Sequence, residues 1–296
     1  MDYGIIFKGI GGFYYVKFND SIYECKARGK FKNQKITPLV GDYVRISIQD
    51  EDKKLGMIEE ILERKTELLR PTVANVNQAI IVFSIKNPLP NIILLDKMLV
   101  LAEQSGLDIV ICFNKADLDV DFDYEKYEAI YHRIGYPVLK TCALEGEGID
   151  ALSVYLQDKI TVFSGPSGVG KSSLLNAVHE GFTLQTGEIS EKIKRGKHTT
   201  RHSELMELKN GGIVVDTPGF TSLSMHEVAP EDLKEYFIEF RMQGESCRFD
   251  NCMHLNEPGC AVKEAVERHD ISKDRYEAYL YILNEINELK RRQKKW

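Results

Sequence analysis

Eight residues in the middle of the chain have the types and spacing of a phosphate-binding loop. The run Gly165-Pro166-Ser167-Gly168-Val169-Gly170-Lys171-Ser172 fits the pattern G-x-x-x-x-G-K-S/T without departure. In such a loop backbone N–H groups surround the β-phosphate, the lysine ammonium lies between the β- and γ-phosphates, and the serine hydroxyl ligates Mg²⁺. We expect a nucleoside triphosphate to bind here, through Gly165, Ser167, Gly168, Val169, Gly170, Lys171, Ser172 and Ser173.

A second group of residues has the chemistry needed to recognise guanine. Asn114-Lys115-Ala116-Asp117 follows the apolar run DIVICF, and the Asp117 carboxylate can accept hydrogen bonds from N1–H and the exocyclic amine of guanine. Adenine has no such donor pair, so the site should prefer GTP or GDP over ATP. Lys115 would lie along the base, and Asn114 would tie loops together. Downstream, Cys142 and Ala143 fit a second base-recognition loop, with the Ala143 N–H meeting guanine O6.

The two halves of this site occur in reversed order, because the base-reading tetrad precedes the phosphate loop. They could belong to two separate nucleotide domains, but each half alone is incomplete. The segment Ala151–Lys159 is short enough to join the end of one half to the first strand of the other. A single circularly permuted GTPase therefore needs fewer assumptions than two truncated domains.

The Mg²⁺ side of the site is predicted to include Asp216-Thr217-Pro218-Gly219, which follows the apolar run GGIVV. Asp216 would hold Mg²⁺ through water, and the Gly219 N–H would sense the γ-phosphate. The next residue is Phe220 rather than a glutamine able to orient water. We therefore expect slow hydrolysis by the chain alone.

The basic run Lys194–Arg201 lies between the phosphate loop and Asp216 and is the candidate first switch. A threonine there could close on Mg²⁺ and the γ-phosphate, and Thr200 is favoured over Thr199, although sequence does not separate them. His198 could orient the attacking water, or could be a surface histidine in a basic loop. The predicted catalytic residues are Lys171, His198 and Thr200.

Near the C-terminus, three cysteines and a histidine have the spacing of a metal site. Cys247, Cys252, His254 and Cys260 form the pattern C-x4-C-x-H-x5-C. This ligand set suits tetrahedral Zn²⁺ and leaves no open position for water, so one structural Zn²⁺ is expected; the alternative is that one cysteine is merely buried. The cluster follows soon after Gly219, so nucleotide state could reposition it.

The elements around these motifs indicate three domains. Residues 1–70 read as short strands separated by turns, which favours an all-β barrel of the OB type that binds RNA or serves only for packing or dimerisation. Residues 71–225 alternate apolar runs with helical segments, as expected for the α/β permuted GTPase. Residues 226–296 read as a mostly helical zinc-binding domain, with helices at Asp232–Phe240 and Ser272–Arg292.

Composition is that of an ordinary globular protein, with 43% apolar and 28% charged residues among 296, and a net charge of −6. The sequence has no run approaching the roughly 20 apolar residues that span a bilayer, and it opens without the features of a secretory signal. We therefore expect a cytoplasmic protein without a membrane partner.

Taken together, the chain resembles the ribosome small subunit-dependent GTPase A (RsgA) family over essentially its whole length. The likeness rests on NKAD before GPSGVGKSS, the GKHTTR loop, DTPGF, the entry at Arg70-Pro71 to Asn77, and the cysteine cluster. The family carries aspartate where this chain has Asn77, and the role of that position stays open. The family shares the apolar residue at Phe220, which implicates His198.

The resemblance implies an OB-fold, a central permuted GTPase and a C-terminal zinc domain that act in late maturation of the 30S ribosomal subunit. In the family, GTP favours docking on the subunit, the subunit stimulates hydrolysis, and the GDP form leaves. The implied partners are the 30S subunit, 16S rRNA and guanine nucleotide, bound by a monomer. The alternatives are a GTP-gated RNA-binding module whose hydrolysis is incidental and, more distantly, a metabolic kinase.

Overall fold

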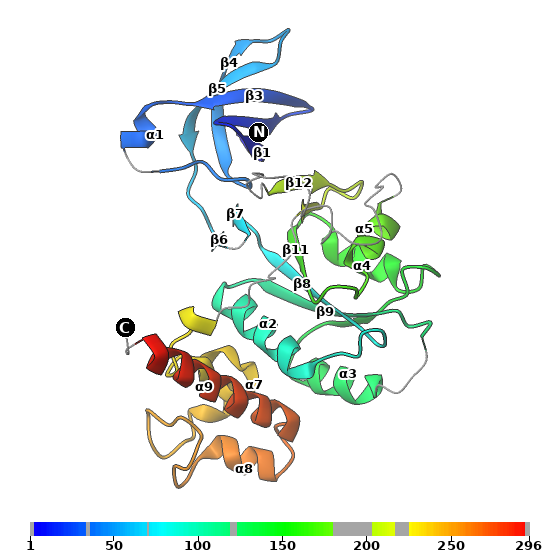
Figure 1. Cartoon of the computed structure of the whole chain (residues 1–296), viewed down its shortest axis with the longest axis vertical. Helices are drawn as coiled ribbons and strands as arrows, with labels where there is room; N and C mark the ends of the chain where they lie inside the picture. Colours follow the sequence, from blue (N-terminus) through cyan, green and yellow to red (C-terminus); the bar gives the residue numbers. More distant parts are fainter. Residues whose placement is uncertain are drawn as a thin grey trace.

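The computed structural model describes residues 3–33, 36–69, 71–118, 123–179, 203–216 and 225–293. A barrel, a central α/β sheet and a helical C-terminal region follow one another along the long axis of the molecule (Figure 1). Within those ranges, every helix is too short or too polar to cross a membrane.

The N-terminal region is a five-stranded barrel, as the alternating pattern predicted; β3 and β5 pair in parallel, and the other neighbouring strands pair antiparallel. Its strands pair in the order β1-β2-β3-β5-β4, and β4 returns to pair with β1. The turn between β1 and β2 needs positive φ at Gly11 and Gly12, which glycine adopts without strain. The elements are β1 (Gly4–Ile10), β2 (Phe13–Phe18), β3 (Ser21–Ala27), α1 (Lys30–Asn33), β4 (Tyr43–Asp50) and β5 (Leu55–Ile61).

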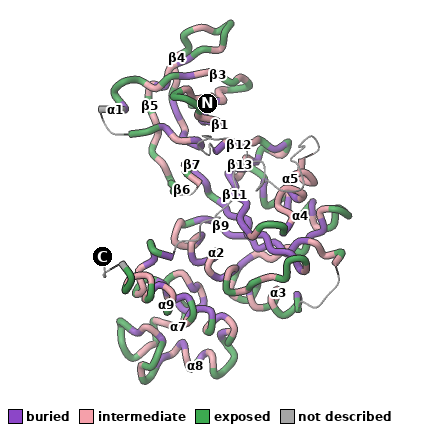
Figure 2. The backbone as a smooth tube through the Cα atoms, in the orientation of Figure 1, coloured by how far each residue is buried: buried purple, intermediate pink, exposed green. Residues whose placement is uncertain are grey.

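The central region is a mainly parallel sheet with helices on both faces. The apolar runs form buried strands (Figure 2), since both faces are covered. Its strands are β8 (Gln78–Ser84), β9 (Asp108–Asn114), β10 (Val138–Lys140), β11 (Ile160–Ser164), β12 (Glu204–Glu207) and β13 (Ile213–Asp216), in the order β10-β9-β8-β11-β13-β12. Its helices are α2 (Ile92–Gln104), α3 (Tyr124–Arg133), α4 (Ile149–Leu156) and α5 (Lys171–Val178).

Strand β12 joins the two regions. It pairs antiparallel with β13 on one side and with β1 of the barrel on the other. Barrel and central sheet are therefore parts of one 11-stranded sheet. A separate hairpin, β6 (Glu67–Leu69) and β7 (Thr72–Ala74), lies on the connection between β5 and β8.

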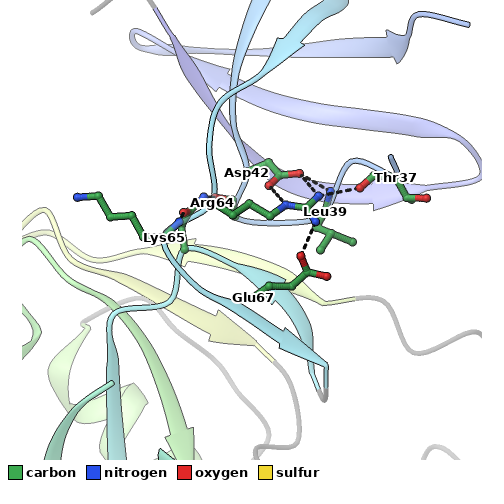
Figure 3. A network of polar contacts seen from close by, with 8 residues as sticks. Thr37, Leu39, Asp42, Arg64, Lys65 and Glu67 are labelled. Carbon is green, nitrogen blue, oxygen red and sulfur yellow. Dashed lines mark hydrogen bonds and ion pairs between the residues drawn. The ribbon is translucent and has the colours of Figure 1, made fainter. Parts of the chain in front are cut away.

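A buried carboxylate fixes the connection between barrel and sheet (Figure 3). Asp42 is fully buried and accepts hydrogen bonds from Arg64 Nε at 2.7 Å and Nη2 at 2.8 Å, while Arg64 Nη1 contacts Glu67 at 2.7 Å. These carboxylates raise the pKa of Arg64. Beside them, Gly41 approaches Ala74 so closely that a Cβ would lie 2.0 Å from the Ala74 carbonyl oxygen.

The C-terminal region packs its helices around an aromatic core. Phe237, Phe240 and Tyr279 are buried against one another, with ring centroids 5.0 to 5.4 Å apart. Its elements are η2 (Met225–Glu227), η3 (Leu233–Tyr236), α7 (Ile238–Gly244), α8 (Ala261–Glu267) and α9 (Lys273–Gln293). The single helix expected over Asp232–Phe240 is wrong in detail: extended backbone at Phe237, with φ −103° and ψ 99°, separates η3 from α7.

Candidate nucleotide site and metal centre

The phosphate loop connects β11 to the N-terminus of α5, where backbone N–H groups favour an anion. Two of its glycines are required by close contacts. A Cβ on Gly165 would lie 2.1 Å from the Val82 carbonyl oxygen, and one on Gly170 would lie 2.3 Å from Asn114 Nδ2. Gly165, Gly168 and Gly170 all have positive φ, so side chains are excluded by conformation as well. Ser167 and Val169 lie in the loop, and Ser172 and Ser173 in the first turn of α5.

Lys171 folds back onto the loop that it follows. Its Nζ donates hydrogen bonds to the carbonyl oxygens of Gly165 at 2.8 Å and Pro166 at 2.6 Å. Burial lowers the pKa of its ammonium to about 8, because the charged form loses hydration. A polyphosphate would supply the negative charge that this ammonium needs.

Asn114 ties the base-reading loop to the other loops, as expected. Its Nδ2 donates to the Val169 carbonyl in the phosphate loop at 2.9 Å. Its Oδ1 accepts from Thr141 Oγ1 at 3.2 Å and from the Ala143 N–H at 3.3 Å. One buried amide therefore connects the tetrad, the phosphate loop and the second base-recognition loop. The role of Thr141 is one that the motifs did not reveal.

Asp117 and Cys142, predicted from separate segments, meet in space. The Cys142 thiol donates to Asp117 Oδ1 at 3.1 Å, and Asp117 is otherwise exposed at the site. Lys115 Nζ donates to the carbonyl oxygen of Asn87, in the loop after β8. Sequence reasoning missed Asn87, which belongs to no recognisable motif.

The Mg²⁺ side of the site is only partly within the described residues. Ser172 lies in the first turn of α5 beside the phosphate loop, and the backbone of Asp216 ends β13, adjacent to the phosphate-loop strand β11. Both positions lie at the carboxyl edge of the sheet, where ligands of α/β sheets bind. His198, Thr199, Thr200, Gly219 and Phe220 lie outside the described residues.

The four predicted metal ligands converge. One ligand atom from each of Cys247, Cys252, His254 and Cys260 lies within 4.8 Å of the others, and His254 Nδ1 is 3.7 Å from Cys247 Sγ and 3.4 Å from Cys260 Sγ. The cluster fits a structural Zn²⁺, since three sulfurs and one imidazole nitrogen make a closed tetrahedral set.

The surroundings of the cluster keep its imidazole neutral and hold its ligand loop in place. Burial lowers the pKa of His254 to about 4, which keeps the imidazole neutral and able to ligate. Burial also raises the pKa of the Cys252 thiol, so a cation is needed to stabilise its thiolate. Tyr276 and Tyr279 hold the ligand loop by donating to the carbonyl oxygens of His254 and Met253, at 2.7 and 2.8 Å.

The tetrad strand β9 and the phosphate-loop strand β11 lie in one sheet, separated only by β8. The reversed motifs therefore build one nucleotide site rather than two. The fold and the site define a circularly permuted GTPase with an N-terminal barrel and a C-terminal region suited to zinc.

Comparison with known proteins identifies the family. The sequence model of the RsgA GTPase family matches residues 61–226, and the sequence model of the RsgA N-terminal domain matches residues 3–58. The chain belongs to the RsgA GTPase family.

Relatives match over their full length. The small ribosomal subunit biogenesis GTPase RsgA of Alkaliphilus metalliredigens is 52% identical over 98% of this chain and 100% of its own. Among solved structures, YjeQ from Thermotoga maritima is 40% identical with a TM-score of 0.85, covering 96% of this chain and 98% of its own. YloQ, a circularly permuted GTPase, is 40% identical with a TM-score of 0.82, covering 97% and 96%.

Proposed function

We propose that this chain is a GTPase of small ribosomal subunit biogenesis, converting GTP and water to GDP and phosphate. The observation that carries the proposal is one network of contacts: Asn114 bonds the Val169 carbonyl of the phosphate loop and the Ala143 N–H, and the adjacent Cys142 bonds Asp117. Full-length relatives named for small-subunit biogenesis support the biological setting.

The finer proposal is that the chain, a cytoplasmic monomer without a membrane partner, binds 16S rRNA on the 30S subunit. The subunit stimulates hydrolysis, and hydrolysis is coupled to release. The apolar Phe220, in place of a water-orienting residue, supports dependence on an outside activator. In domain terms, residues 1–70 bind RNA, 71–225 bind and hydrolyse GTP, and 226–296 hold zinc.

The residue roles are proposed as follows. Asp117, Lys115 and the Ala143 N–H recognise guanine, with Cys142 holding the Asp117 carboxylate. Lys171 and the phosphate-loop N–H groups neutralise the phosphates. Mg²⁺ is held by Ser172, by Thr200 or Thr199, and by Asp216 through water, with Gly219 sensing the γ-phosphate. His198 orients the attacking water.

Hydrolysis with and without purified 30S subunits tests this function. Subunits should raise the rate, and His198→Ala should lower the stimulated rate about 100-fold or more, the range for loss of a general base or water-orienting group. His202→Ala, four residues away along the chain, is the matched control and should retain stimulation.

The rival function is a GTP-gated RNA-binding module whose hydrolysis is incidental. Release of the chain from 30S subunits after GTP addition separates the two. If His198→Ala abolishes hydrolysis and departure is as fast as before, the rival function is correct.

A further inference from the structure

The pairing of the barrel with β12 has a direct geometric relation to the Mg²⁺ side of the nucleotide site. Lys8 on β1 lies opposite Glu204 on β12, and Glu204 lies opposite Asp216 on β13. Two neighbouring strand pairings therefore connect the barrel to the backbone of the aspartate assigned to Mg²⁺.

Ion pairs connect the barrel to both ends of β12. Lys8 Nζ contacts Glu204 Oε2 at 2.7 Å, and Lys17 on β2 pairs with Glu207 at the other end of β12. Strand β12 has only four residues, so two lysines of the barrel engage both of its ends. Opposite charges on neighbouring strands favour one register over a slipped one.

Apolar packing also holds β12 against the barrel. Leu205 lies opposite Val215, and both belong to the buried cluster that contains Phe7 of β1. Lys17 also lies over the Phe7 ring, 5.9 Å from its centroid. A shift of the barrel relative to β12 would therefore disturb packing one residue away from Asp216.

We propose that Lys8 and Lys17 of the barrel are positioning residues for Mg²⁺, acting through β12 on the carboxyl end of β13. They touch neither nucleotide nor metal. Their effect is to fix the strand that carries Asp216, so a barrel that shifts on binding a partner changes how well the site holds Mg²⁺. The inference rests on the proposed function, because it takes Asp216 as the residue that holds Mg²⁺ through water.

Charge reversal tests the proposal. Lys8→Glu/Lys17→Glu places like charges beside Glu204 and Glu207, and a swapped variant adds Glu204→Lys/Glu207→Lys to restore both ion pairs. Mg²⁺ is titrated while the dissociation rate of a fluorescent GDP and the rate of GTP hydrolysis are measured. Because like charges would weaken the contact between the barrel and β12, we expect the half-saturating Mg²⁺ concentration to rise about threefold to tenfold.

The swapped variant should return to the wild-type Mg²⁺ midpoint, and GDP affinity without Mg²⁺ should be unchanged in both variants. Reversal of an exposed pair within the barrel, Arg45→Glu/Glu60→Arg, is the matched control; these residues are 3.0 Å apart on β4 and β5. Its Mg²⁺ midpoint should equal that of wild type.

An unchanged midpoint in the reversed variant overturns the inference, as does failure of the swap to restore it. Equal loss of GDP affinity with and without Mg²⁺ would show a merely structural role and also overturn it. The GDP measurement decides the inference even if GTP is not hydrolysed, and in that case the proposed function fails by itself.

Discussion

At the scale of single residues, the pKa of Lys171 should make nucleotide affinity depend on pH. Its ammonium is buried against two carbonyl oxygens, and its pKa is about 8 rather than the ordinary 10.5. Phosphate oxygens favour the charged form, so the pKa of Lys171 is higher when nucleotide is bound. Binding must therefore take up a proton whenever the free lysine is neutral.

The expected result is a pH-dependent affinity for GDP. Below about pH 8 the free lysine is already charged and affinity is at its plateau. Above that value log affinity should fall with a slope approaching one per pH unit, until the pKa of the bound state is reached. Equilibrium titration with GDP between pH 7 and 9 measures this slope. Calorimetry in buffers of different ionisation enthalpy gives the number of protons taken up on binding.

Lys171→Met serves as the control, because guanine N1–H also ionises at alkaline pH. The variant should bind more weakly and lack the change that begins near pH 8. If wild type and Lys171→Met lose affinity in parallel, the proton taken up does not belong to Lys171.

Sequence predicted the residues whose role is set by local pattern, and missed those whose role depends on distant contacts. The phosphate loop, Asp117 and the four metal ligands belong to motifs with fixed spacing. Thr141 and Asn87 reach Asn114 and Lys115 only because strands far apart in the chain lie side by side. No spacing rule along the chain encodes such contacts.

At the scale of elements, the structure resolves the question that Asn77 left open. Its N–H donates to the Ile160 carbonyl at 3.0 Å, its Oδ1 accepts from the Ile160 N–H at 2.9 Å, and its carbonyl accepts from the Asp108 N–H at 2.9 Å. Asn77 thus aligns the first residues of β8, β9 and β11 at the edge opposite the nucleotide. The side chain contributes an acceptor oxygen, which aspartate also has.

Asn77→Asp should therefore leave stability within about 1 kcal/mol of wild type. Asn77→Ala removes the acceptor for the Ile160 N–H and should cost about 1–2 kcal/mol. Urea unfolding of the two variants measures both. Equal destabilisation by alanine and aspartate would show that the amide nitrogen, rather than Oδ1, matters.

Elements differ in how far sequence specifies them. Short apolar runs rich in β-branched residues, such as AIIVFSI and DIVICF, favour buried strands in an α/β sheet, and they were predicted correctly. The four-residue strand β12 has no signal of comparable strength, because it forms by pairing with β13 and β1. The break at Phe237 likewise depends on tertiary packing, since Phe237 is buried against Phe240 and Tyr279.

At the scale of the whole molecule, side-chain contacts also dock the C-terminal region on helix α2 of the central region, in addition to the covalent connection after β13. Arg275 of α9 is only 2% exposed; its Nε donates to Glu239 of α7 at 2.7 Å, and its Nη1 donates to Asp96 of α2 at 2.5 Å. Tyr131 of α3 donates to the same Asp96 oxygen at 2.8 Å. Any movement of the zinc region that follows nucleotide state must therefore carry α2 with it or break a buried ion pair.

Removal of the Arg275 side-chain charge should consequently lower the free energy of unfolding by a large amount. Arg275→Met leaves two buried carboxylates without their cation, and breaking such a pair costs about 3–5 kcal/mol. Lys273→Met, on the same helix, removes an exposed partner of Glu277 and should cost at most about 1 kcal/mol.

Denaturant unfolding of the zinc-loaded chain measures the stability of both variants, and hydrogen exchange of α2 and α9 shows where stability is lost. If hydrogen exchange is faster in α9 of Arg275→Met while α2 stays protected, docking at α2 contributes little to the stability of the central sheet. If the two methionine variants are equally stable, Arg275 does not hold the regions together.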